Sequence, residues 1–174
     1  MKYLLEVLRH HHQKSCKSCA ASGMEIICKC HELIPLNDFR FQEQFGDTNI
    51  GFEHAKLLSP LGIEAKTRSL SITDCLDLLE TETTQGRFPL VSLPVKLEVP
   101  YLHCHVFLCG KDKNELALFD PANGKLRFAS REVLENHMNS LLRQIPNRPH
   151  IDVLVYSIAN SQNHNCKQTE IANG

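Results

Sequence analysis

The stretch from residue 13 to residue 27 reads Gln-Lys-Ser-Cys-Lys-Ser-Cys-Ala-Ala-Ser-Gly-Met-Glu-Ile-Ile. From Cys19 onward, the spacing of the apolar residues predicts a helix that runs to about Leu33 and is ended by Pro35. A helix N-terminus favours a thiolate over a thiol because it carries partial positive charge and free N–H groups. Gln13, six residues before this cysteine, can donate a hydrogen bond to the oxyanion that forms when the thiolate attacks a carbonyl. The stretch therefore predicts two parts of an acyl-transfer site.

A histidine and an aspartate that complete such a site lie in residues 103–124, which have the pattern of a β-hairpin. His105 stands near the start of the first strand and Asp120 at the end of the second, with a polar, glycine-containing loop between the strands. We expect Cys109 to pair with Leu116, which places the histidine directly opposite the aspartate, with Cβ atoms about 5 Å apart. This is the arrangement of base and orienting carboxylate that a Cys-His-Asp triad requires.

The rest of the chain predicts helices first and strands later. Residues 3–9 fit a short helix or a strand, and residues 37–51 read as an irregular connection. The run from residue 151 to residue 156 is almost continuously apolar, which is typical of a central strand. Further helices are expected at residues 52–58, 71–82 and 131–143, and strands at residues 62–66, 89–95, 102–109, 115–119, 125–128 and 151–158. The predicted class is α+β, with an N-terminal helical lobe whose cysteine-bearing helix packs on a C-terminal antiparallel β-sheet.

Length and composition set limits on the architecture and the partners. The chain has 174 residues, so we expect one domain over residues 1–158 and a polar, disordered tail over residues 159–174. Net charge is −1 and no basic patch stands out, which argues against a nucleic-acid partner. The apolar start of the chain is interrupted at Glu6, so neither a signal peptide nor membrane insertion is expected. The eight cysteines then indicate a cytoplasmic protein with reduced thiols; delivery into a host by a route without a signal peptide stays open.

The motif residues resemble a known family. Gln13 to Cys19 is similar to the nucleophile motif of papain-type enzymes, including the extra cysteine at position 16. An apolar strand near Pro89, a strand that opens with histidine, and Asp-Pro-Ala-Asn-Gly from residue 120 resemble the bacteriocin-processing, double-glycine leader peptidases, over roughly residues 10–158. The resemblance implies a papain-like fold, Cys19 as nucleophile, His105 as base, Asp120 as orienting residue and Gln13 as oxyanion donor.

The same residues permit other interpretations. Cys16 is the rival nucleophile and His103 the rival base, while Asp120 in its Asp-Pro context also suits a simple turn. The remaining possibility is a zinc site, because cysteines at positions 16, 19, 28 and 30 precede or flank a histidine at position 31. The predicted helix sends the cysteines at positions 28 and 30 to different sides, so no metal and no other cofactor is expected.

The sequence thus predicts a papain-like thiol hydrolase that acts on a peptide or protein substrate, with peptide cleavage as the first choice. Glutamine deamidation or transglutaminase-like transfer on the same fold is the alternative chemistry, as in a secreted effector, because all these reactions use the same thiol. A non-catalytic zinc-binding module is the alternative from another functional class. Substrate identity and oligomeric state do not follow from these residues.

Overall fold

A computed structural model describes residues 2–15, 17–48, 50–96, 102–112, 115–121, 124–145 and 150–159, with the backbone alone for residues 2, 3, 94–96, 102–108 and 112. The predicted tail therefore lies outside the described residues except for Ala159, whose amide donates to the carbonyl of Gly62 at 2.9 Å. Within these parts of the chain, no helix is long and apolar enough to cross a membrane.

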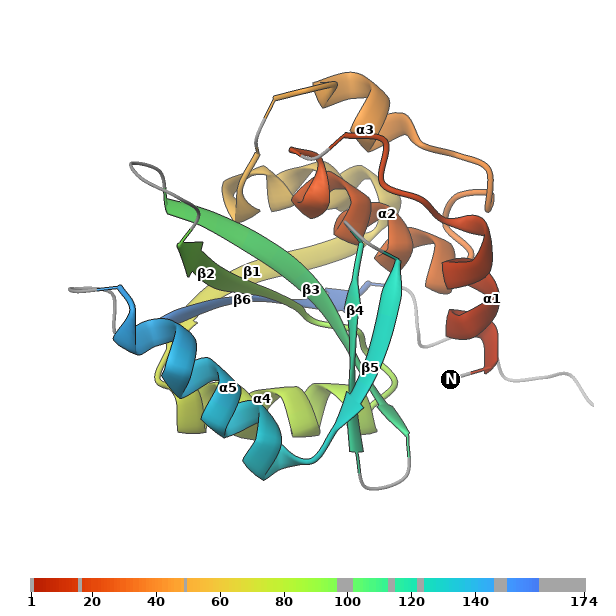
Figure 1. Ribbon diagram of the computed structural model, residues 1–174. Coiled ribbons are helices and arrows are strands. Elements are labelled where there is room, and N and C mark those ends of the chain that lie inside the picture. The colour runs from red at the N-terminus through yellow and green to blue at the C-terminus, as the bar shows by residue number, and fades with distance from the viewer. Residues whose placement is uncertain are drawn as a thin grey trace, which may run out of the picture.

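A six-stranded antiparallel sheet forms the centre of the fold (Figure 1). Its strands are β1 (Ile63–Leu70), β2 (Leu90–Lys96), β3 (Leu102–Asp112), β4 (Glu115–Asp120), β5 (Lys125–Ala129) and β6 (Ile151–Ile158). Their order is β1-β6-β2-β3-β4-β5, so the almost continuously apolar β6 lies between two neighbours, as its sequence predicts.

Helices cover both faces of this sheet. They are α1 (Lys2–His10), α2 (Cys19–Cys30), α3 (Arg40–Phe45), the 3-10 helix η1 (Phe52–Leu61), α4 (Ile72–Thr84) and α5 (Arg131–Arg143). The helices of the first 61 residues gather on one side, and α4 and α5 lie on the other (Figure 1). The α+β class and the packing of the Cys19 helix on an antiparallel sheet are therefore confirmed.

Helix α2 is the core of the N-terminal side. Its residues from Cys19 to Lys29 are all buried, and its apolar side chains join one core cluster with Leu90, Phe119 and Leu154 of the sheet. The helix ends earlier than predicted, because Glu32 takes a left-handed conformation with φ 57° and the amide of Leu33 donates back to the carbonyl of Cys28.

A second core cluster lies between the sheet and the α4–α5 pair. It joins Leu76 and Leu79 of α4 and Leu134 and Met138 of α5 to sheet residues such as Val153. Both helices begin at a serine whose hydroxyl accepts a backbone hydrogen bond three residues on, as capping requires: Ser71 from Asp74 and Ser130 from Val133.

Two expectations from the sequence are corrected. Residues 37–51 contain α3, whose six residues are too few to give a clear apolar period. The β3–β4 hairpin pairs Cys109 with Leu118, not with Leu116, because β3 continues through the polar residues predicted as loop and reaches Asp112. Continuing the ladder by one step puts Asp120 opposite position 107, two residues from His105.

Gly23 marks the tightest contact between α2 and the sheet. A Cβ atom there would lie 2.8 Å from Cδ2 of the fully buried Leu90. We expect Gly23→Val to lower the free energy of unfolding by about 1–3 kcal/mol, because overpacking forces the helix off the sheet. The matched control is Asn136→Val on exposed α5 surface, which should change stability by about 0.5 kcal/mol or less. Urea denaturation measures both, and equal stability of the two variants would contradict this packing.

Candidate active site

Cys19 is the first residue of α2 and is 6% exposed. The first amide to bond within the helix is that of Ser22, which donates to the carbonyl of Ser18 at 2.8 Å. The amides before it therefore belong to the open first turn, where the helix dipole favours negative charge. The predicted position of the cysteine at a helix N-terminus is confirmed.

The loop before Cys19 is held by a buried glutamine of α3 that the sequence did not single out. Oε1 of Gln42 accepts from the backbone amide of Lys14 at 2.8 Å and from the Ser18 hydroxyl at 3.0 Å. Its Nε2 donates to the carbonyl of His12 at 3.2 Å. One side chain thus fixes the backbone on both sides of Gln13 and the residue before Cys19.

Glu25 of α2 fixes that glutamine in turn. Its carboxylate accepts from the backbone amide of Gln42 at 2.8 Å and from Nε2 at 2.7 Å, and its side chain is fully buried. Burial raises the pKa of Glu25, and the hydrogen bonds from Gln42 act in the opposite direction. A glutamate between the apolar residues Met24 and Ile26 is the feature of the sequence from which a buried hydrogen-bonding partner could have been predicted.

Gln13 lies within this held loop and is partly buried. Its Nε2 donates to the carbonyl of Ser15 at 2.5 Å, and its Oε1 is buried without a hydrogen-bond partner among the described residues. The side-chain amide is therefore close to the start of α2 but is directed at a loop carbonyl. Its role as oxyanion donor stays a prediction.

His11 is a buried histidine two residues before Gln13, and the structure gives it a structural role. Its Nε2 lies 2.6 Å from the Ser22 hydroxyl and its Nδ1 lies 3.1 Å from Nζ of Lys29. Burial, followed by the charge of Lys29, lowers the pKa of His11 to about 3. With both ring nitrogens engaged and the ring neutral, His11 does not serve as a base for Cys19.

Lys29 is fully buried beside this histidine. Its Nζ lies 3.9 Å from the centroid of the Phe39 ring, which gives the ammonium a cation–π partner in place of water. Burial lowers the pKa of Lys29, and the charge of Glu25 opposes that shift. Lys29, His11 and Ser22 thus tie the end of α1 to α2.

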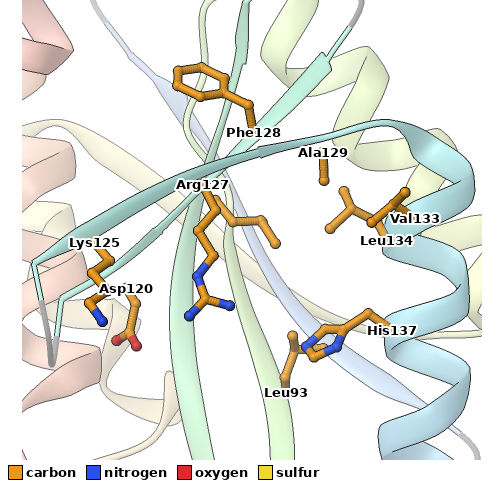
Figure 2. Close-up of a pocket in the computed structure, with 10 residues that line it drawn as sticks. Leu93, Asp120, Lys125, Arg127, Phe128, Ala129, Val133, Leu134 and His137 are labelled. Carbon is orange, nitrogen blue, oxygen red and sulfur yellow. The ribbon is translucent and has the colours of Figure 1, made fainter.

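Asp120 and position 105 of β3 belong to the other face of the sheet. Asp120 lines a pocket with Leu93 of β2 and His137 of α5 (Figure 2). The β2–β3 ladder pairs His105 with Leu93, which is buried in the α5-side cluster. Since directly opposed residues share a face, positions 105 and 120 belong together on the α5 side, whereas Cys19 packs on the α2 side. The side chains of His105 and of the rival base His103 lie outside the described atoms.

Among the other cysteines whose side chains the structure describes, Cys28, Cys75 and Cys109 are buried and Cys30 is half-buried. Burial raises the pKa of Cys28, Cys30 and Cys75 to about 12, and raises that of Cys109 well above its ordinary value. The rival nucleophile Cys16 lies outside the described residues. In the part of the chain that the structure describes, no three His, Cys, Asp or Glu residues group as metal ligands.

No family model matches the chain, and no curated protein matches it. Among solved structures, the chain is similar to the Pseudomonas avirulence protein AvrPphB at 15% sequence identity. The likeness covers 90% of this chain and 71% of that one with a TM-score of 0.36. The resemblance to the bacteriocin-processing peptidases stays a prediction.

The buried His11 makes stability depend on pH. Its folded-state pKa of about 3 lies below the ordinary histidine pKa of 6.5, so between these values the unfolded chain binds a proton that the folded chain does not. Stability is therefore lost as pH falls from 6.5 to about 3, by up to about 1.4 kcal/mol per pH unit. We expect His11→Gln to remove this slope in urea denaturation measured across the range.

His10→Gln is the control, because His10 is the exposed neighbour of His11 and should keep the slope. Glu25, whose pKa is raised, contributes in the opposite direction but equally in each variant, so it cancels in the comparison. An unchanged slope in His11→Gln would contradict the neutral, buried histidine.

Proposed function

We propose that this protein is a thiol-dependent amide hydrolase with Cys19 as its nucleophile, and that it cleaves a peptide bond in a peptide or protein substrate. The observation that carries the proposal is the place of Cys19 as the first residue of the buried helix α2. Cys28, Cys30 and Cys75 are poor candidates for the nucleophile, since burial raises the pKa of their thiols to about 12.

In the proposed reaction, the Cys19 thiolate attacks the carbonyl carbon and the carbonyl oxygen becomes an oxyanion. The Gln13 side chain and the Cys19 amide donate to that oxyanion, for which the Gln13 amide turns from the carbonyl of Ser15. His105 gives its proton to the leaving amine, which departs and leaves a thioester. The histidine then takes a proton from water, which attacks the thioester and releases the acid, while Asp120 orients the ring.

This mechanism requires the ring of His105 to reach Cys19. The regular ladder puts position 105 on the face of Leu93, and α2 packs across the other face of β3. The β2–β3 ladder is regular from the Leu90–Leu108 pair to the Lys96–Leu102 pair, so position 105 belongs to the face opposite α2, which is the face of Asp120. The approach of His105 to Cys19 therefore stays a prediction.

The reactivity of the cysteines provides the first test. We expect mild alkylation with iodoacetamide at pH 6 to label Cys19 before Cys28, Cys75 or Cys109, because the helix N-terminus favours its thiolate and burial disfavours theirs. Peptide mapping by mass spectrometry identifies the labelled residue. Cys19→Ala should leave the fold intact and abolish the labelling, and earlier labelling of Cys28 would overturn the assignment.

The base provides the second test. Incubation with a proteome-derived peptide library, followed by mass spectrometry, should reveal new peptide termini for the native protein and none for Cys19→Ala. We expect His105→Ala to cost more activity than Asp120→Asn, because the first removes the base and the second only misorients it.

His137→Ala is the matched control, because His137 lines the pocket beside Asp120 and has no role in the proposed reaction. If His137→Ala, and not His105→Ala, abolishes cleavage, the base is reassigned. Library peptides in which glutamine becomes glutamate without any new terminus identify side-chain deamidation in place of peptide cleavage.

A further inference from the structure

A pocket of about 310 Å³ lies on the α5 side of the sheet, between β4, β5 and α5 (Figure 2). Its floor is apolar and consists of Leu93 from β2, Leu118 from β4 and Leu134 from α5, all of which are buried. Val133 at the rim is 58% exposed, which is unusual for so apolar a side chain. The pocket therefore offers an apolar surface that a ligand can cover.

An arginine reaches into this pocket from β5. Arg127 pairs with Leu118 across the β4–β5 ladder, so both belong to the same face, and Figure 2 shows its guanidinium between Asp120 and Leu93. Among the described residues it has no hydrogen-bond or ion-pair partner. Arg131, at the start of α5, differs because its guanidinium forms ion pairs with Asp77 at 2.7 Å and Glu80 at 3.2 Å.

The charges around the pocket favour a ligand with one negative charge. Lys125 and Asp120 are direct partners in the β4–β5 ladder and offset each other in charge. Arg127 then leaves an excess of one positive charge among the pocket residues, and its planar fork fits a carboxylate with two parallel hydrogen bonds. A dianion would meet the carboxylate of Asp120.

We propose that this pocket binds the C-terminal residue of a peptide or protein, with an apolar side chain on the leucine floor and the free α-carboxylate on Arg127. A C-terminal Leu, Ile, Val or Phe carries both groups on one residue, and Arg127 is the direct ladder partner of the floor residue Leu118. The inference is separate from the proposed catalysis, with which it shares only Asp120.

The probe is a fluorescein-labelled Gly-Gly-Leu peptide with a free C-terminal carboxylate, and its matched control is the same peptide as the C-terminal amide. Binding is measured by fluorescence anisotropy with Cys19→Ala protein, so that no cleavage occurs and failure of the hydrolase proposal does not affect the result. We expect the acid to bind at least about tenfold more tightly than the amide, since a charge-assisted pair contributes about 1.5–3 kcal/mol.

Arg127→Gln should bind acid and amide equally, at the level of the amide. Arg68→Gln is the matched control because Arg68 is an exposed arginine on β1, at the opposite edge of the sheet, and it should keep the full preference for the acid. Val133→Asp places a carboxylate at the exposed rim, so it should weaken binding of the acid peptide more than binding of the amide peptide.

Three results would overturn the proposal. The first is equal binding of acid and amide by the Cys19→Ala protein that keeps Arg127, and the second is a loss of the preference for the acid in Arg68→Gln as large as in Arg127→Gln. The third is displacement of the labelled peptide by octanoate at the same concentration as by unlabelled Gly-Gly-Leu. The last result would identify a site for fatty carboxylates in place of a peptide C-terminus. Thermal melts of each variant confirm that the compared proteins are folded.

Discussion

The carboxylate of Glu25 and the side chain of Gln42 form the contact on which the N-terminal half depends. Four hydrogen-bonding groups from the loop and the helix, those of His12, Lys14, Ser18 and Glu25, converge on this one amide. Removing this side chain leaves the buried carboxylate of Glu25 with the backbone amide of residue 42 but without the donor at its other oxygen, which costs more than the bond contributes when made. The loop that leads to Cys19 has its shape because of this contact.

The described part of the same half buries, besides cysteines, the ionisable side chains of His11, Glu25 and Lys29. Burial shifts each pKa towards the neutral form, lowering those of His11 and Lys29 and raising that of Glu25. Burying ionisable groups lowers the free energy of unfolding because they lose their hydration. Their arrangement around the loop specifies one conformation at that cost. The start of α2 is therefore held more rigidly than hydrophobic packing alone would achieve, which suits a nucleophile that must keep its position.

The regular elements were predictable from the sequence because each has a strong local signal. The α5 helix has a capping serine and an amphipathic face, and β6 has an almost continuous apolar run. The hairpin register was not predictable, because residues 110–112 are polar enough for a loop yet pair as strand. The Gln42 network was not predicted, because a glutamine on a six-residue helix has no periodic context. Its hydrogen-bond partners also lie far away in the chain, at sequence separations of 17 to 30 residues.

The predicted site depends on two sequence patterns, the helix periodicity around Cys19 and the strand alternation around His105 and Asp120. Helix periodicity fixes where α2 begins, and so fixes Cys19 at the N-terminus. The relation between Cys19 and His105 depends instead on strand alternation, in which a one-residue change moves a side chain to the other face of the sheet. Asp120, two residues from the register predicted for it, still shares a face with position 105 because an error of two preserves alternation. The sequence pattern is therefore robust for the His105–Asp120 pair, because residues 105 and 120 share a face in either register, whereas the face of the sheet that carries position 105 decides its relation to Cys19.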